Sequence, residues 1–306
     1  MAKLFLGTRE VTPTIYDHKE GYPELPSYQV VNGVASRRSC ALTSNEFSDI
    51  TSISDYALYY AFYGHTGITG AVSLSDLVSV ATYGLSYAFR GCTGITSVDL
   101  SSLTTVSSYG LQNAFDSCSH ITSIDLSSIE TISTTGAFDS AFSYCYALDN
   151  VNLSSLKTIS ATYAFRKAFY YCNQASLSNI NLSSLKTISG TDPLRECFCG
   201  CTRLTNISFP ALDTLGSNTF YYCFYNCTRL SHIYFNSLNT NSFGSYTNQF
   251  SNMFNSGSLG TASTSGSCTI HFPSNLSSKV SGLTGYPTFG GDSSRIHLAF
   301  DLPATS

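Results

Sequence analysis

Charged residues are scarce in this chain of 306 residues, where Asp, Glu, Lys and Arg make up 11% against about a quarter in ordinary globular proteins. The formal net charge is −4 at pH 7, and no stretch of the chain gathers basic residues. Binding to nucleic acid depends on Lys and Arg that neutralise phosphates, so the sequence predicts no nucleic-acid partner. Uncharged Ser, Thr, Asn and Tyr must cover much of the surface instead.

Long apolar runs are also missing. No stretch approaches the length of a membrane-spanning helix, so no membrane span is expected. The first ten residues contain an apolar run of only three residues, Leu4 to Leu6, and do not resemble a secretory signal peptide. We therefore expect a virion or an extracellular surface that is reached by a route other than the secretory pathway.

Sequence signatures of catalysis are absent. The chain has no G-x-S-x-G, H-E-x-x-H, G-x-G-x-x-G or phosphate-loop motif, and its six His are scattered over unrelated positions. Cys197, Cys201, Cys223 and Cys227 form C-x3-C twice, whereas zinc knuckles use C-x2-C. Because these cysteines fall on positions that face the core elsewhere, buried thiols are favoured over zinc. The sequence predicts a protein that is not an enzyme and binds no cofactor or metal.

A repeat organises the rest of the chain. The phrase Ala-Phe-x-x-Cys starts at Ala88, Ala114, Ala141 and Ala168. Weaker copies start at Ala61, Cys197, Cys223 and Met253, so that successive starts are 26 to 30 residues apart. Self-similarity with this period predicts a solenoid, in which stacked units bury a common core.

Each unit predicts one helix and one strand. Leu85, Ala88, Phe89 and Cys92 follow the i, i+3, i+4, i+7 spacing of a two-turn helix with one apolar face. Farther along the unit, Val98 alternates with polar neighbours, as in a short strand with one buried face. Stacked units would form a parallel sheet on one side and a row of helices on the other. Six of the 11 cysteines share the last position of the phrase, which argues for buried thiols rather than a disulfide framework: Cys92, Cys118, Cys145, Cys172, Cys201 and Cys227.

The I-x-x-I-x-L strand phrase and the A-F-x-x-C phrase, as in residues 111–126, resemble BspA-like leucine-rich repeats. The resemblance covers residues 50–276 and implies an α/β, right-handed, curved solenoid. The regular Asn of common leucine-rich repeats is missing at the turn, where Ser-Ser follows the strand instead. We assign residues 37–272 to the solenoid.

The two ends fall outside the repeat. Residues 1–36 contain a candidate hairpin at residues 4–15, and the phrase KLFLGTREVTP is similar to openings of bacteriophage tail-region proteins. This segment is interpreted either as an attachment element for other subunits of a virion or surface assembly, or as an N-terminal cap. Residues 273–306 are expected to form a C-terminal cap, and their phrases Phe-Gly-Gly and Leu298 to Pro303 are similar to tails of prophage-associated BspA-like proteins.

The outward strand positions give the candidate site. In a parallel sheet, equivalent residues of adjacent strands align about 4.8 Å apart. One predicted row on the concave face therefore contains Asp99, Asp125, Asn152, Asn181, Ser208 and Tyr234. A second predicted row contains Ser97, Ser123, Asn150, Asn179, Asn206 and His232. Residues 237–267, rich in Ser, Asn and Gly, are an alternative binding segment.

Two function classes follow from these patterns. The first is an adhesion or receptor-binding module on a virion or cell surface that binds a host glycan or protein, and self-association is compatible with it. The second is a structural spacer or assembly protein, and a bacterial cell-surface BspA-like adhesin is a further alternative. A binding face should vary along the solenoid, and the drift from Asp99 to Tyr234 favours binding.

Overall fold

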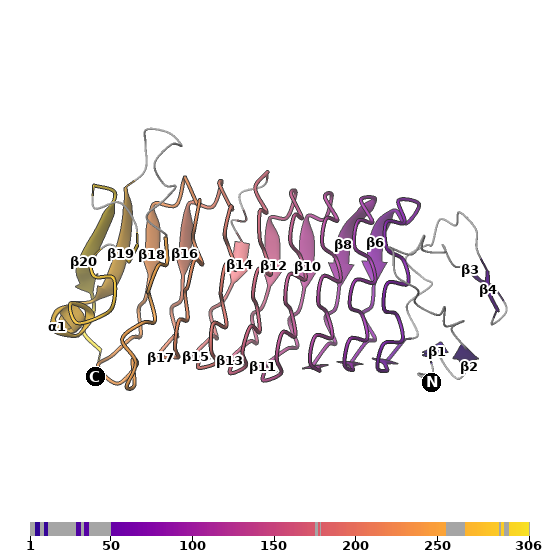
Figure 1. Ribbon diagram of the computed structural model, residues 1–306, viewed down its shortest axis with the longest axis horizontal. Coiled ribbons are helices and arrows are strands. Elements are labelled where there is room, and N and C mark those ends of the chain that lie inside the picture. The colour runs from indigo at the N-terminus through magenta and orange to yellow at the C-terminus, as the bar shows by residue number, and fades with distance from the viewer. Residues whose placement is uncertain are drawn as a thin grey trace, which may run out of the picture.

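The computed structural model is an elongated stack of similar coils (Figure 1). It describes residues 50–174, 177, 179–254, 267–287, 289–290 and 294–305, and the backbone of four short strands nearer the N-terminus. Each regular coil has three walls, which are a strand of a larger parallel sheet, a two-residue strand of a smaller sheet, and a wall of turns. The predicted solenoid is confirmed as a parallel β-solenoid, while its right-handed sense stays a prediction.

The larger wall is divided into a five-stranded and a four-stranded parallel sheet. The first comprises β6 (Gly70–Ser73), β8 (Ile95–Asp99), β10 (Ser123–Asp125), β12 (Asn150–Asn152) and β14 (Asn179–Asn181). The second comprises β16 (Asn206–Ser208), β18 (His232–Tyr234), β19 (Cys268–Pro273) and β20 (Ile296–Leu302). We call the outward side of these nine strands the sheet face.

A second wall was not predicted. Its strands have two residues each: β5 (Ser52–Ile53), β7 (Ser79–Val80), β9 (Thr105–Val106), β11 (Thr131–Ile132), β13 (Thr158–Ile159), β15 (Thr187–Ile188) and β17 (Thr214–Leu215). In each strand the second residue is buried and the first points outward. Two residues are too few for the alternation that reveals a strand in a sequence.

The predicted helix in each coil is wrong, because the third wall consists of successive turns. Tyr83, Tyr87 and Gly91 have φ of 55°, 58° and 73°, so every fourth residue is left-handed. Amide groups alternate between two acceptors: Ala88 N donates to Leu85 O within the coil (2.9 Å), and Phe89 N donates to Ala114 O in the next coil (2.8 Å). We call this surface the turn wall, and its segments are residues 56–64, 83–91, 109–117, 136–144, 163–171, 192–200 and 218–226.

The spacing of apolar residues cannot distinguish the two structures over so short a segment. An α-helix repeats every 3.6 residues, and these turns repeat every four. Positions i, i+3, i+4 and i+7 therefore face inward in both. In the part of the chain that the structure describes, the only helices are the 3-10 turn Ser274–Leu276 and α1 (Ser277–Val280) near the C-terminus.

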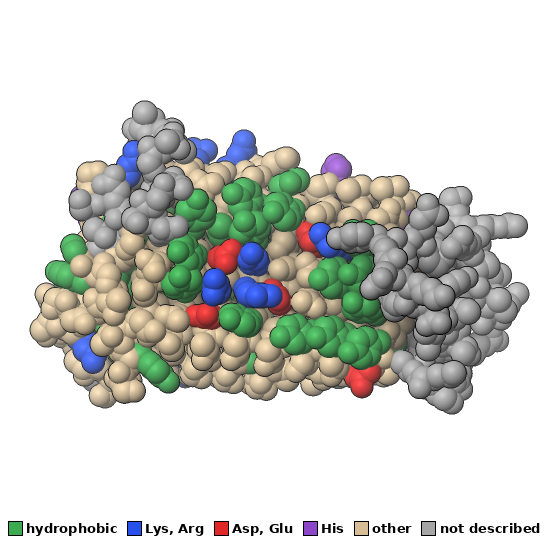
Figure 2. Space-filling view, in the orientation of Figure 1, with side chains coloured by type: hydrophobic (Ala, Val, Ile, Leu, Met, Phe, Trp, Pro, Cys, Tyr) green, Lys and Arg blue, Asp and Glu red, His purple; other side chains and the backbone are tan. Residues whose placement is uncertain are grey.

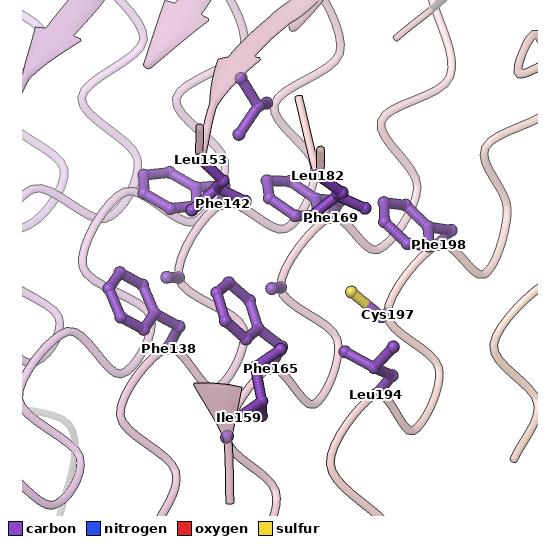
Figure 3. Packing of buried hydrophobic residues seen from close by; sticks show 14 of the residues in the cluster. Phe138, Phe142, Leu153, Ile159, Phe165, Phe169, Leu182, Leu194, Cys197 and Phe198 are labelled. Carbon is purple, nitrogen blue, oxygen red and sulfur yellow. The ribbon is translucent and has the colours of Figure 1, made fainter. Parts of the chain in front are cut away.

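The predicted core is confirmed. Rings from equivalent positions stack from coil to coil, with centroids 5.2 Å apart for Phe89 and Phe115 and 5.7 Å apart for Phe115 and Phe142. Figure 3 shows Phe142, Phe169 and Phe198 in one such row, with Phe138, Phe165 and Leu194 in a second. These six side chains are all buried.

The two ends differ from the regular coils. Near the N-terminus, β1 (Leu4–Leu6) pairs antiparallel with β2 (Arg9–Val11), and β3 (Gln29–Val31) with β4 (Val34–Ser36). The role assigned to residues 1–36 otherwise lies outside the described residues. At the C-terminus, β20 pairs in parallel with β19, so the sheet continues into the segment expected to form a cap.

Candidate functional site

The sheet face presents the two predicted rows, in register within each sheet. Ser97, Ser123, Asn150 and Asn179 are direct neighbours on adjacent strands, as are Asp99, Asp125, Asn152 and Asn181. In the second sheet, Asn206 aligns with His232 and Ser208 with Tyr234. The strand residue between the rows packs inward, as Val98, Ile124 and Ile233 do. Whether these rows bind a ligand stays a prediction.

Four residues of the first row also have a structural role that sequence reasoning missed. The side-chain oxygens of Asp99, Asp125, Asn152 and Asn181 each accept a hydrogen bond from the backbone N–H two residues later, at 2.9, 2.9, 3.2 and 3.1 Å. Such Asx turns fix the chain as it leaves the strand. The repeated pattern of Asp or Asn followed two residues later by Ser was the signal that could have revealed them.

Side chains of neighbouring coils also bind one another along the rows. Asn152 Nδ2 donates to Asp125 Oδ1 at 3.2 Å, and Asn179 Nδ2 donates to Asn150 Oδ1 at 2.9 Å. Some polar side chains in the middle of the sheet face therefore already have hydrogen-bond partners within the protein. Asn179 and Asn206 are exposed and form no Asx turn, so they can be changed with less effect on the backbone than Asn152 and Asn181.

The C-terminal end of the sheet face gathers aromatic and ionisable groups from three strands. Tyr234 and His232 of β18 lie beside His271 of β19, and His271 Nδ1 is 2.9 Å from a carboxylate oxygen of Asp301 on β20. Sequence analysis identified His232 and Tyr234 but missed the other two. Because residues 235–267 separate β18 from β19, a longer interval than in the regular coils, the repeat spacing does not place His271 or Asp301.

The two ends of the sheet face carry different kinds of ionisable side chain. Asp99 and Asp125 lie near its N-terminal end. The turns before β16 and β18 expose Arg203 and Arg229 at equivalent positions. Figure 2 shows blue side chains along the upper edge of the C-terminal half. This end is thus richer in cationic and titratable groups than the other.

The turn wall is a second patterned surface that sequence reasoning did not identify. Tyr83 stacks between Tyr56 and Tyr109, with centroids 5.0 and 5.2 Å apart. Arg90 Nε is 2.9 Å from the buried Asp116 carboxylate, and burial raises the pKa of that carboxyl above its ordinary value. Figure 2 shows green side chains interspersed with blue and red ones across this wall. Tyr and Arg, together with Trp, are enriched at interaction hot spots.

The repeated cysteines belong to the core. Each donates its Sγ–H to the carbonyl of the Phe thirty or so residues earlier, as Cys118 does to Phe89 O (3.0 Å) and Cys145 to Phe115 O (3.2 Å). Burial raises the pKa of the Cys92 thiol to about 12. All ten described cysteines are free and buried, and no group of three or more His, Cys, Asp and Glu among the described residues could hold a metal ion.

Thiolates, not thiols, are the reactive species, so native protein is expected to react slowly with a thiol reagent. A Cys40→Ser variant removes the one cysteine outside the described residues. This variant should show almost no reaction when native and reaction of its ten thiols when denatured. Reagent consumption measured by absorbance checks this, and fast labelling of Cys118 and Cys145 in native protein, located by mass spectrometry, would contradict it.

Comparisons with known proteins agree with the repeat. A family model described as BspA type leucine rich repeat region matches six copies, over residues 52–191 and 165–270. A comparison with curated proteins found no match. None of the described helices has the length and apolar character needed to cross a membrane.

Solved structures of bacterial proteins are also similar to this chain. A leucine-rich repeat protein from Bacteroides ovatus is 15% identical, with 92% of this chain and 93% of that chain covered and a TM-score of 0.18. One from Eubacterium ventriosum is 16% identical, with coverage of 62% and 72% and a TM-score of 0.20. The pneumococcal vaccine antigen PcpA is 13% identical, with coverage of 93% and 100% and a TM-score of 0.18. The matched repeats span most of the sequence, and the chain belongs to the BspA type leucine-rich repeat family.

Proposed function

We propose that this chain is a non-enzymatic adhesion module on a virion or another surface assembly, where the sheet face binds a host glycan or protein. Residues 1–36 would join it to neighbouring subunits. The observation that carries the proposal is the variation of the polar rows, which change from Asp99 and Asp125 through Asn152 to Tyr234. Repeat folds of this family are commonly used for binding, and no catalytic family is indicated.

The outward residues of the smaller sheet can be compared with the varying polar rows of the sheet face. Its outward row is almost uniform, since it contains Ser79, Thr105, Thr131, Thr158, Thr187 and Thr214. Both walls are built from the same repeat and both need polar outward residues. The need for solubility and stacking therefore does not account for the variation on the sheet face, which supports recognition there.

A triple variant tests the proposal. Asn179, Asn206 and Tyr234 are changed together to Ala, while Asn152 and Asn181 stay intact because their side chains form Asx turns. We expect at least about a tenfold loss of binding to intact cells and surface glycans, since losing one or two good contacts removes about 1.4 kcal/mol or more. Labelled protein measured by flow cytometry and on a glycan array checks this.

The matched control changes Thr131, Thr158 and Thr187 of the smaller sheet to Ala, and it should bind like the unmodified protein. Equal binding by both triple variants, each shown to be folded, would remove the sheet face from the proposal.

The second candidate function is an assembly or spacer role through the turn wall. One observation favours it: Tyr56, Tyr59 and Tyr63 expose 54%, 37% and 39% of their surface in one patch. If changing these three residues to Ser abolishes association with the parent assembly while cell binding by the isolated protein is kept, the turn wall serves assembly and the sheet face serves recognition.

A further inference from the structure

The C-terminal end of the sheet face contains a set of stacked rings. The rings of Tyr234 and His271 are 4.4 Å apart and inclined by 14°, and those of His232 and Tyr234 are 5.8 Å apart and inclined by 20°. On its other side along the row, Tyr234 has Ser208, whose side chain is too short to cover the opposite ring face. An uncovered aromatic face beside polar groups suits the apolar face of a sugar ring. We call His232, Tyr234, His271 and Asp301 the relay site.

Hydrogen bonds link three of these residues in one chain. His271 Nδ1 lies 2.9 Å from both carboxylate oxygens of Asp301, and His271 Nε2 lies 2.9 Å from His232 Nδ1. An ionised carboxylate only accepts, so the proton of a neutral His271 is on Nδ1. Its Nε2 must then accept from His232 Nδ1, which leaves His232 Nε2 as an unprotonated acceptor. Nε2 of His232 has no hydrogen-bond partner among the described residues.

When the relay site takes up one proton, the direction of the hydrogen bond between His232 and His271 reverses. The unprotonated His232 Nε2 takes a proton from solvent, and the proton on His232 Nδ1 passes along the hydrogen bond to His271 Nε2. His271 is then an imidazolium, which donates to Asp301 from Nδ1 and to His232 from Nε2. His232 Nδ1 must then accept, so its own proton resides on Nε2. The outward atom of His232 thus changes from an acceptor to a donor, while Asp301 accepts a hydrogen bond from the protonated His271 ring.

The groups around the relay site favour an anion. The turns before β16, β18 and β20 contain Arg203, Arg229 and Arg295. On the strands themselves, β20 adds an exposed His297, β19 adds His271 and the buried Cys268, and β16 adds no ionisable side chain. The acidic side chain on these four strands is Asp301, which is already bound to His271.

We propose that the relay site binds an acidic saccharide, and that binding tightens when His271 and His232 together take up a proton. The proposal rests on the proposed function and names its ligand class. Tyr234 contacts the sugar ring, and His232 Nε2–H donates to the carboxylate or sulfate. At higher pH the same atom presents a lone pair to the anion, which is unfavourable.

Binding of saccharides is measured by isothermal titration at about pH 5.5 and about pH 7.5, on the two sides of the usual histidine pKa. The probes are polygalacturonate, dextran sulfate and neutral dextran at equal ionic strength. We expect polygalacturonate to bind at least about tenfold more tightly at the lower pH, as a charge-assisted hydrogen bond is worth about 1.5–3 kcal/mol. Tighter binding of dextran sulfate would identify sulfate rather than carboxylate as the preferred anion.

Variants separate the relay from a general charge effect. The double variant His232→Gln/His271→Gln should bind with the same affinity at both pH values, because both histidines of the relay site are removed. Tyr234→Ala should weaken binding at both pH values and keep their ratio. The matched control His297→Gln removes a histidine from the same surface and should keep the ratio as well.

Any of four results would overturn the proposal. Equal loss of pH dependence in the double variant and in His297→Gln would show a general charge effect. Binding that is independent of pH, or equally tight for neutral dextran, would refute the relay while leaving the sheet face as a binding surface. No binding of any of the saccharides at either pH would exclude the ligand class, and the cell-binding comparison of the triple variants would then decide the proposed function separately.

Discussion

Replacing Phe142 with Ala is expected to lower the free energy of unfolding by about 3–5 kcal/mol, the range for emptying a large aromatic site in a core. The side chain is fully buried, and its ring stacks between Phe115 and Phe169, with centroids 5.7 and 6.0 Å away. Stacked aromatic pairs add about 0.5–1.5 kcal/mol beyond the buried area. Neighbouring coils cannot close the cavity, because their own rings occupy equivalent positions on both sides.

Urea unfolding followed by circular dichroism measures this loss. Coils contact only their neighbours, so the weakened central interface is expected to split the unfolding into two transitions. Tyr246→Ala is the control, because this side chain is 48% exposed and surface substitutions usually change stability by about 0.5 kcal/mol or less. A loss below about 1 kcal/mol for Phe142→Ala would contradict the packing described above.

Replacing Arg166 with Ala is expected to destabilise the protein by about 3–5 kcal/mol at neutral pH, as measured when one partner of a buried ion pair is removed. Arg166 Nε donates to Asp139 Oδ1 at 3.0 Å, and the Asp139 side chain is 1% exposed. Without the guanidinium, this buried carboxylate keeps Ser140 Oγ as a neutral donor at 3.1 Å. The charge of Asp139 would then be largely uncompensated.

Lys157→Ala provides a matched control. Lys157 Nζ and Glu130 Oε2 are 2.9 Å apart across neighbouring coils, but their side chains are 53% and 60% exposed. Removal of this pair should change stability by less than about 1 kcal/mol. The double variant Arg166→Ala/Asp139→Asn should recover part of the loss, because it removes the unpaired charge. Equal effects of Arg166→Ala and Lys157→Ala would show that Asp139 is not buried as described.

The sequence predicted those features that depend on an unbroken repeat. The register of Val98, Ile124 and Val151 on adjacent strands followed from one coil period, and so did the burial of Phe115 and Cys118. The polar rows could be predicted for the same reason. The turn wall could not be predicted, because four-residue turns and a short helix both place the same residues in the core. Tyr, Ser and Lys occupy several left-handed positions, and these residue types do not indicate a positive φ in a sequence. Gly91 and Gly136 occur at the same spacing and gave only a weak indication of turns.

The missing half of the relay site illustrates a second limit. His232 and Tyr234 could be placed because they keep the repeat spacing. His271 and Asp301 lie on β19 and β20, which are longer strands outside that spacing. A pairing that depends on three-dimensional closeness of strands outside the repeat spacing has no signal in a single sequence. The Asx turns had a signal in the repeated spacing of Asp or Asn and Ser, but it requires knowledge of where each strand ends.

The alternating hydrogen bonds of the turn wall have a mechanical consequence. Bonds such as Phe89 N to Ala114 O join successive coils, as the sheet ladders do on the other two walls, so on every wall hydrogen bonds run along the solenoid axis. A force that pulls the two ends apart acts along these hydrogen bonds, and the coils are expected to separate one at a time. A coil of about 27 residues that occupies about 4.8 Å of axis can extend to roughly 90 Å when its chain is straightened. A module attached at one end and bound to a surface at the other would therefore lengthen in steps under tension.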